Sequence, residues 1–208
     1  MTQAKSKPIP KTFLEYLHYD DGTDNSYELI DGKLNKVEPE SEENAFIAQC
    51  LGRLLEPFFG IRRVKFQRFA LEVPPLPGMP LNRDPDLVVL MPEHLPLMKD
   101  LGKMAITKEM PPPILLAEVV SPYKSGNAAN FSRDYNEKPR QYAMRGVPEY
   151  WIIDPQQAFV EVNWEPDKDQ GQYLKQKTFH ENESIQSNLP ELAAFQATVQ
   201  QVLHPPIE

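Results

Sequence analysis

The chain has almost no cysteine and no cluster of histidines. Cys50 is the only cysteine in 208 residues, so an internal disulfide and a CxxC metal site are both excluded. The four histidines are scattered, and none pairs with another at the spacing of a metal-ligand motif: His18, His94, His180 and His204. A single thiol is typical of proteins from a reducing compartment, and we expect a cytoplasmic location.

Long apolar runs are also missing. No segment approaches the roughly 20 consecutive apolar residues that a transmembrane helix needs. The opening stretch MTQAKSKPIPK carries charge but lacks the apolar core of a signal peptide. We therefore expect no membrane partner.

The chain has fewer basic than acidic residues. Lysine and arginine number 22 against 30 aspartates and glutamates, which gives a formal net charge of −8. A general nucleic-acid binder is usually basic, but a local basic face or bound divalent cations can offset such a deficit. The apolar share of 40% is ordinary for a soluble globular protein. We expect a flexible tail over residues 1–10 and one domain over 11–208.

The order of patterns along the chain predicts an α/β or α+β domain with a central mixed β-sheet. Asp31-Gly32 is typical of a tight hairpin turn, and apolar residues recur with helical spacing over 41–59, with Ser41 as the cap. A helix is expected to begin near Pro139, because proline is tolerated at a first helical position, and to end at Gly146. The other expected elements are helices over 11–20, within 92–111 and over 196–203, and strands over 62–73, from 86, over 112–120, 149–154, 158–164 and 172–180.

Two expected strands carry an acid where a buried strand has no reason to hold one. The run 112-PPILLAEVVSP-122 surrounds Glu118 with apolar residues, and 84-DPDLVVLMP-92 places Asp86 at the start of another run. Burying an unpaired charge is costly. Because alternate residues of a strand share a face, Glu118 should point with Leu116 and Val120. Two carboxylates that meet at strand ends would suit Mg²⁺ or Mn²⁺, which favour oxygen ligands, and a nearby lysine would complete such a site.

These residues also form an ordered series of motifs. Pro85-Asp86 is followed by Glu118 with 119-VVSP-122, then by the series Asp134, Lys138 and Tyr142, and then by 146-GVPEYWIIDP-155. Together with 27-YELIDGKL-34, this series resembles the Uma-type family of predicted restriction endonucleases, within the PD-(D/E)XK nuclease superfamily. The resemblance covers residues from about 11 to 200 and implies a restriction-endonuclease-like fold.

The resemblance also implies roles for individual residues. Asp86 and Glu118 would be the metal ligands, and Glu28 would be a further acid that orients or adds a ligand. The usual superfamily lysine lies two residues after the glutamate, where this chain has Val120. Lys138, from the following helix region, is the expected substitute, and Lys124 is a reserve candidate.

The sequence departs from the family pattern at two positions. Asn44 stands where the family commonly has a histidine, and Pro139 directly follows the expected lysine. We expect Pro139 to shift Lys138 by about a turn, which would weaken the site. The expected phosphate contacts come from the densest basic patch nearby: Arg133, Arg140 and Arg145.

The resulting functional hypothesis is a Mg²⁺- or Mn²⁺-dependent endonuclease that hydrolyses phosphodiester bonds in DNA. Two alternatives stay open at this stage. One is a catalytically inactive nuclease fold that binds nucleic acid or protein, and the other is a hydrolase that uses Asp86 and Glu118 as a metal-free acid/base pair. Analogy with duplex-cutting nucleases adds a homodimer as a candidate assembly, because two antiparallel strands call for two symmetry-related sites.

Overall fold

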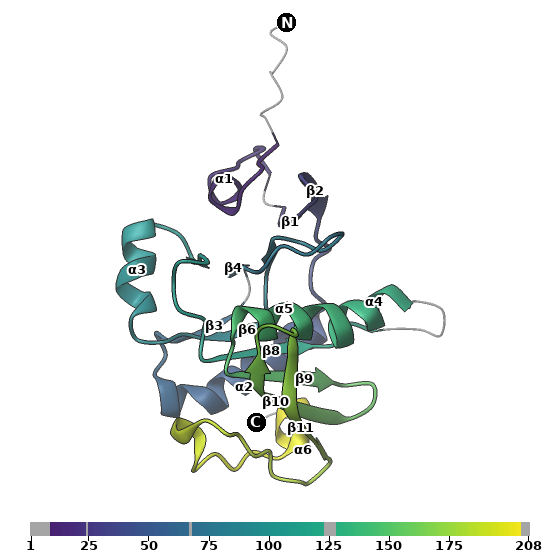
Figure 1. Cartoon of the computed structure of the whole chain (residues 1–208). Helices are drawn as coiled ribbons and strands as arrows, with labels where there is room; N and C mark the ends of the chain where they lie inside the picture. Colours follow the sequence, from purple (N-terminus) through teal and green to yellow (C-terminus); the bar gives the residue numbers. More distant parts are fainter. Residues whose placement is uncertain (1–8, 24, 67, 123–127, 205–208) are drawn as a thin grey trace, which may run out of the picture.

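The computed structural model describes residues 9–23, 25–66, 68–122 and 128–204, and Figure 1 shows the course of the chain. The tail expected over residues 1–10 lies outside the described residues except for Ile9 and Pro10. Lys124, the reserve lysine, also lies outside them. The assignment of 11–208 to one domain stays a prediction.

A six-stranded mixed sheet forms the centre of the molecule, in the order β11-β10-β9-β8-β6-β3. Strands β8 and β9 are parallel, and the other neighbouring pairs are antiparallel. This arrangement confirms the expected α+β class with a mixed sheet. The bounds are β3 (Val64–Phe66), β6 (Leu87–Val89), β8 (Leu115–Val119), β9 (Glu149–Asp154), β10 (Phe159–Asp167) and β11 (Gln172–His180).

Strand β8 lies inside the sheet between β6 and β9, and all five of its residues are buried. Its odd-numbered residues pack on the side of helix α2 (Glu42–Phe59), in the core cluster that also holds Ile47 and Leu51. Leu116 and Val120 belong to a second core cluster, which also contains Tyr142. The prediction that Leu116 and Val120 share one face is therefore confirmed.

Helix α2 begins where the sequence predicts. The Ser41 side chain accepts a hydrogen bond from the Asn44 backbone N–H at 3.1 Å, which caps the helix. The face buried against the sheet includes Ile47, Leu51 and Leu55. Helix α6 (Val199–Leu203) packs beside α2 and covers the same side of the sheet.

The expected strand over 62–73 is wrong as a single element. Residues 64–66 form β3 in the central sheet, whereas β4 (Ala70–Glu72) belongs to a small sheet with β5 (Asn82–Arg83) and β7 (Ala105–Ile106). Arg68 lies between the two strands with a positive φ of 52°, a conformation that breaks an extended strand. Alternating side chains do not reveal this change of sheet.

The hairpin prediction and two further helix predictions are confirmed. Strands β1 (Tyr27–Ile30) and β2 (Lys33–Lys36) form a hairpin around Asp31 and Gly32, whose φ angles of 46° and 74° fit the tight turn. Helices α1 (Phe13–Leu17) and α3 (His94–Leu101) lie within their expected regions.

The helix expected to begin near Pro139 begins earlier. Residues 128–145 run continuously through α4 (Ala128–Ser132), a π-helical turn η1 (Arg133–Glu137) and α5 (Lys138–Arg145). In the wider turn, the Lys138 N–H donates to the Arg133 carbonyl, five residues back. This widening accommodates Pro139, which has no N–H to donate, without ending the helix. Gly146 ends it with a φ of 80°, as expected.

None of the helices in the described ranges combines the length and the apolar character needed to cross a bilayer.

Gly52 offers a test of how α2 packs on the sheet. A Cβ added there would lie 1.9 Å from Cε1 of Phe66 on β3. We expect Gly52→Ala to lower the free energy of unfolding by about 1–3 kcal/mol through overpacking, measured by urea denaturation. In a Phe66→Ala background the same change should become stabilising by up to about 1 kcal/mol, because only the helix propensity of alanine remains. Equal effects in both backgrounds would contradict this packing.

Candidate active site at the ends of strands β6 and β8

A partly buried ion pair joins strand β8 to helix α5. The Lys138 Nζ lies 2.9 Å from Oε2 of Glu118, which is 1% exposed. The same Nζ lies 2.9 Å from Oδ1 of Asp134, one helical turn earlier and also 1% exposed. Lys138 therefore sits between two buried carboxylates. The expected shift of Lys138 by about a turn does not occur, because the π-helical turn keeps Lys138 facing β8.

The charges around Lys138 set its protonation state. Burial alone would lower the pKa of Lys138, but the negative charges of Glu118, Asp134 and Asp86 outweigh burial and raise it above the ordinary value. For Asp134, burial would raise the pKa, but the charges of Lys138 and Arg133 lower it. At neutral pH, Lys138 is therefore an ammonium group and Asp134 is a carboxylate.

The other oxygen of Glu118 is held by a tyrosine. The Tyr142 hydroxyl, one turn after Lys138 on α5, donates to Oε1 of Glu118 at 2.5 Å. Burial and then the charge of Glu118 raise the pKa of Tyr142 well above its usual value, so the hydroxyl stays a donor. Both oxygens of Glu118 are thus oriented from α5.

Asp86 reaches the same strand end from β6. Its Oδ2 accepts a hydrogen bond from the backbone N–H of Val119 at 2.7 Å, directly after Glu118. Burial raises the pKa of Asp86 well above its usual value, and the negative charge of Glu118 adds to that effect. The structure therefore brings together the two acids that the sequence singled out.

Asn44 binds the other backbone group of the same residue, the Val119 carbonyl. Its Nδ2 donates to the Val119 carbonyl at 3.3 Å and to Oε1 of Glu40 at 2.8 Å. Asn44 is 2% exposed and belongs to the first turn of α2. Asn44, which departs from the family pattern, thus connects α2 to the end of β8 that carries Glu118.

Glu28 lies on β1 and forms an ion pair that the sequence did not predict. Arg83 NH1 lies 3.0 Å from Glu28 Oε1, and Arg83 NH2 lies 3.4 Å from Glu137 Oε2. The Arg83 Nε donates to Oε1 of Gln141 on α5 at 2.8 Å. Arg83 is 1% exposed, so this network links the hairpin to the helix that carries Lys138. No spacing rule in the sequence connects positions 28, 83 and 137.

The three predicted phosphate-binding arginines have different surroundings. Arg133 pairs with Asp134 at 3.0 Å and donates to the Ser121 hydroxyl at 3.2 Å. Arg145 NH2 donates to two backbone carbonyls, at 2.9 and 2.7 Å, in the segment after β7. Arg140 is exposed on α5. Contact with phosphates stays a prediction for all three.

Asp84 is an acid near the site that the sequence analysis did not select. It accepts a hydrogen bond from the Phe69 N–H at 2.6 Å. Burial raises the pKa of Asp84 to about 6, although that hydrogen bond opposes the rise. Asp84 and Asp86 both line a cavity of about 310 Å³, together with Glu40, Arg68 and residues 36–39. This cavity gives a small ligand access to Asp86.

The donor atoms suit a hard divalent cation. Within the described ranges, no group of three or more histidine, cysteine, aspartate or glutamate side chains is arranged to hold a metal by itself. Asp86 and Glu118 therefore supply two carboxylates, and water or substrate oxygens would have to complete the coordination, as is common for Mg²⁺. The raised pKa of Asp86 fits such an ion, because a cation would relieve the repulsion between the two acids.

A comparison with solved structures finds a protein with a similar fold. A crystal structure described as a "putative nuclease belonging to DUF820" from Anabaena variabilis, at 1.96 Å resolution, superposes with a TM-score of 0.64 at 16% identity. The match covers 93% of this chain and 98% of the other, and it concerns the fold alone. A search of curated proteins finds no match.

The sequence itself matches a family model along most of its length. The match spans residues 13–200, which include both acids, Lys138 and Asn44. The expected resemblance to the Uma-type family is therefore confirmed. The chain belongs to the Uma2 family, whose description is "Putative restriction endonuclease".

Proposed function

We propose that the protein is a Mg²⁺- or Mn²⁺-dependent endonuclease that hydrolyses phosphodiester bonds in DNA. The observation that supports this most strongly is the position of Lys138, whose Nζ lies 2.9 Å from Glu118 beside the strand end that also holds Asp86. Two carboxylates and one lysine at a strand end can hold a cation and a phosphate together. Membership of the Uma2 family supports the nuclease class.

Asp86 and Glu118 would hold the cation. When bound, that ion would supply Lewis-acid polarisation of a phosphate oxygen and a lowered pKa for an attacking water. Tyr142 and Lys138 orient Glu118 through its two oxygens, and the Val119 N–H orients Asp86. Such hydrogen bonds to ligand side chains fix their geometry and their charge.

Lys138 would act as a cation and not as a base. Its raised pKa keeps it protonated at neutral pH, so it cannot accept a proton from water there. An ammonium group has three N–H donors, and two are directed at Glu118 and Asp134. The third can hold the attacking water or a phosphate oxygen, which stabilises the negative charge that develops as the phosphodiester bond breaks.

Glu28 would serve as an additional acid at the edge of the site. Arg83 holds one of its oxygens, and the charge of Glu28 acts on both Asp84 and Arg133. It can thus orient water or add a ligand, as the family resemblance implies. The proposed phosphate contacts on η1 and α5 are Arg133, Arg140 and Arg145.

The direct test is cleavage of supercoiled plasmid and of single-stranded DNA with Mg²⁺, with Mn²⁺ and with EDTA. We expect wild type to cut only with metal, and Asp86→Ala to lose at least about two orders of magnitude in rate, because the ion and the water it activates are both lost. Arg62→Ala, which changes an exposed arginine outside the site, should cut as wild type does.

Other outcomes separate the alternatives. Cutting that persists in EDTA would favour metal-free acid/base chemistry by Asp86 and Glu118. Binding of DNA without cutting under any of these conditions would favour the inactive module.

A second test uses stability in the absence of metal. Folding raises the pKa of Asp86 above its ordinary value of 3.8, so the stability of the metal-free protein should fall as pH rises through the folded pKa. Asp86→Asn removes this titration but keeps an acceptor for the Val119 N–H. In EDTA at neutral pH we expect this variant to melt at the same or a higher temperature than wild type.

The same melting measurement gives the metal response. Mn²⁺ should raise the melting temperature of wild type and raise that of Asp86→Asn much less, because the variant loses the charge of one of the two carboxylate ligands. A variant that is less stable than wild type in EDTA and equally stabilised by Mn²⁺ would contradict the assignment.

A further inference from the structure

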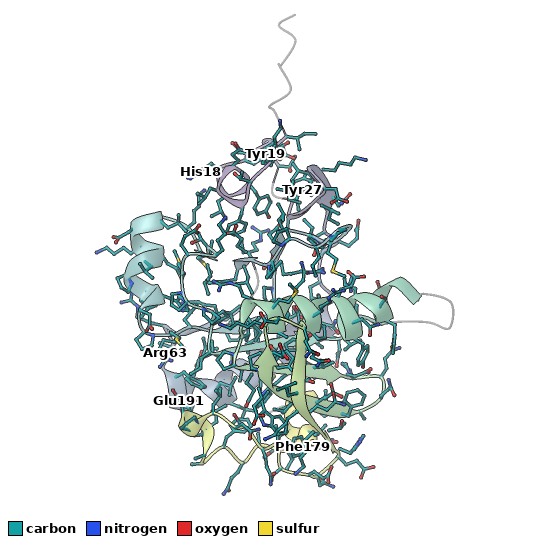
Figure 2. All side chains as sticks on the ribbon, in the orientation of Figure 1. His18, Tyr19, Tyr27, Arg63, Phe179 and Glu191 are labelled. Atoms are coloured by element: carbon teal, nitrogen blue, oxygen red, sulfur yellow. The ribbon has the colours of Figure 1, made fainter. Side chains whose placement is uncertain are left out.

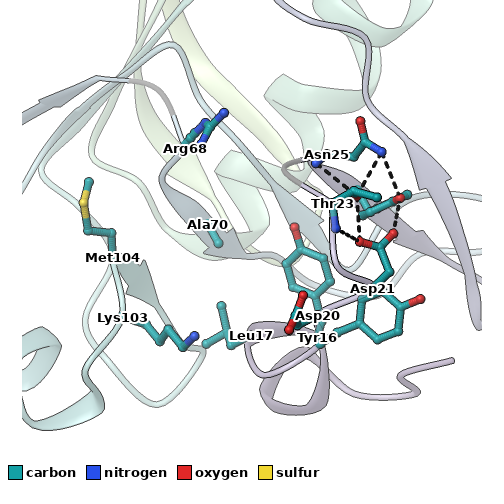
Figure 3. A pocket seen from close by; sticks show the side chains of 12 residues that line it. Tyr16, Leu17, Asp20, Asp21, Thr23, Asn25, Arg68, Ala70, Lys103 and Met104 are labelled. Atoms are coloured by element: carbon teal, nitrogen blue, oxygen red, sulfur yellow. Dashed lines mark hydrogen bonds between the residues drawn. The ribbon is translucent and has the colours of Figure 1, made fainter. Parts of the chain in front are cut away.

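A chain of three cavities leads away from Asp86. The first, of about 310 Å³, contains Asp84 and Asp86 in its wall. The second, of about 280 Å³, shares Asp84 with the first, and the third, of about 270 Å³, reaches Tyr19 and the loop before β1. Arg68 and Asn25 line all three. Figure 2 shows Tyr19 and Tyr27 at the end of the molecule that carries α1, and Figure 3 shows the third cavity from close by.

The position of Arg68 is fixed relative to Asp86 by its neighbours. Phe69 is fully buried, and its N–H donates to Oδ1 of Asp84 at 2.6 Å. Asp84 precedes Asp86 by two residues, with Pro85 between them. The backbone of the 68–69 segment is therefore held against the segment that carries the proposed metal ligand.

Arg68 itself holds a conformation that disfavours any residue with a Cβ. Its φ is 52°, a value that glycine adopts without steric cost. Backbone strain of this kind clusters at ligand-binding and catalytic positions, although turns also hold it, as at Asp31. The arginine side chain is thus present where the backbone alone would favour glycine.

The charge of Arg68 is available to a ligand. Its side chain is exposed, and within residues 9–23, 25–66, 68–122 and 128–204 no carboxylate forms a salt bridge with it. Arg133 and Arg145, by contrast, already bind a carboxylate and backbone carbonyls. The walls of the other cavities add neutral donors and acceptors, such as Asn25 and Tyr16. The third cavity also carries charges of both signs, from Lys103 and from Asp20 and Asp21.

We infer that Arg68 binds a backbone phosphate of the nucleic acid, next to the phosphate that is cleaved. The strand that carries both phosphates then follows the three cavities away from Asp86. This inference rests on the proposed nuclease function and adds a binding residue from the segment between β3 and β4. An arginine suits this role because its guanidinium donates two parallel hydrogen bonds to phosphate oxygens.

Binding of DNA without cleavage tests the inference. The probe is a fluorescein-labelled duplex or single strand, measured by anisotropy with Ca²⁺ in place of Mg²⁺ over a series of salt concentrations. We expect Arg68→Ala to weaken binding roughly tenfold, as for the loss of one charged hydrogen-bonded contact. The slope of log K against log salt should fall in magnitude by about 0.7–0.9, because one fewer counterion is released.

Two further variants test whether weaker binding by Arg68→Ala reflects a general loss of positive charge or a misfolded protein. Arg62→Ala removes an exposed arginine six residues away that lines none of the three cavities, and it should leave both affinity and salt slope nearly unchanged. Arg68→Gly should bind as weakly as Arg68→Ala, yet melt at the same or a higher temperature than wild type, because glycine relieves the strained φ. Lost binding without lost stability would exclude misfolding.

The outcomes distinguish this inference from the proposed function. If wild type binds DNA and Arg68→Ala behaves as Arg62→Ala does, the Arg68 contact is overturned while the nuclease proposal stands. If wild type binds neither probe, both are overturned.

Discussion

The contact between Lys138 and Glu118 is the interaction on which the rest of the site depends. Glu118 is buried and Lys138 is partly buried, and each charge would be costly to remove from water alone. Their mutual attraction, with Asp134 as a third partner, makes the carboxylate tolerable in the middle of an apolar strand. A charge arrangement of this kind requires strand β8 and helix α5 to hold fixed positions.

The π-helical turn and the contacts of Val119 hold helix α5 and strand β8 in these positions. The π-helical turn before α5 presents Asp134 and Lys138 to the sheet together and accommodates Pro139. Asn44 and Asp86 hold the carbonyl and the N–H of Val119, so the strand end after Glu118 is fixed from two directions. Burial, and then the negative charge of Glu118, nevertheless raise the pKa of Asp86, and a divalent ion between the two acids would offset both effects.

The sequence predicted what depends on local patterns and on strong motifs. The hairpin at Asp31, the helix capped by Ser41 and the strands from residue 149 onward follow from turn chemistry and periodicity, and they are confirmed. Glu118 was recognisable because an acid in a buried strand needs a partner.

What the sequence could not predict depends on contacts between distant segments. The pairing of Arg83 with Glu28 joins residues 55 positions apart, and no pattern marks it. The division of residues 62–73 between two sheets depends on the φ of Arg68, which side-chain alternation does not encode. Pro139 was misjudged because a wider helical turn leaves no signature in residue spacing. The roles of Asp86, Glu118, Lys138 and Glu28 stay predictions until they are measured.

The central claim is that Glu118 is buried in β8 to hold a cation together with Asp86. Calorimetric titration of Mn²⁺ into wild type and into Glu118→Gln tests it most directly, since glutamine keeps the size of the side chain and one oxygen that can accept from Lys138, while its amide NH2 can donate to the Tyr142 hydroxyl. We predict that wild type binds the ion and that the variant loses at least about tenfold in affinity. Equal affinity for both proteins would contradict the claim and leave Glu118 as a structural partner of Lys138.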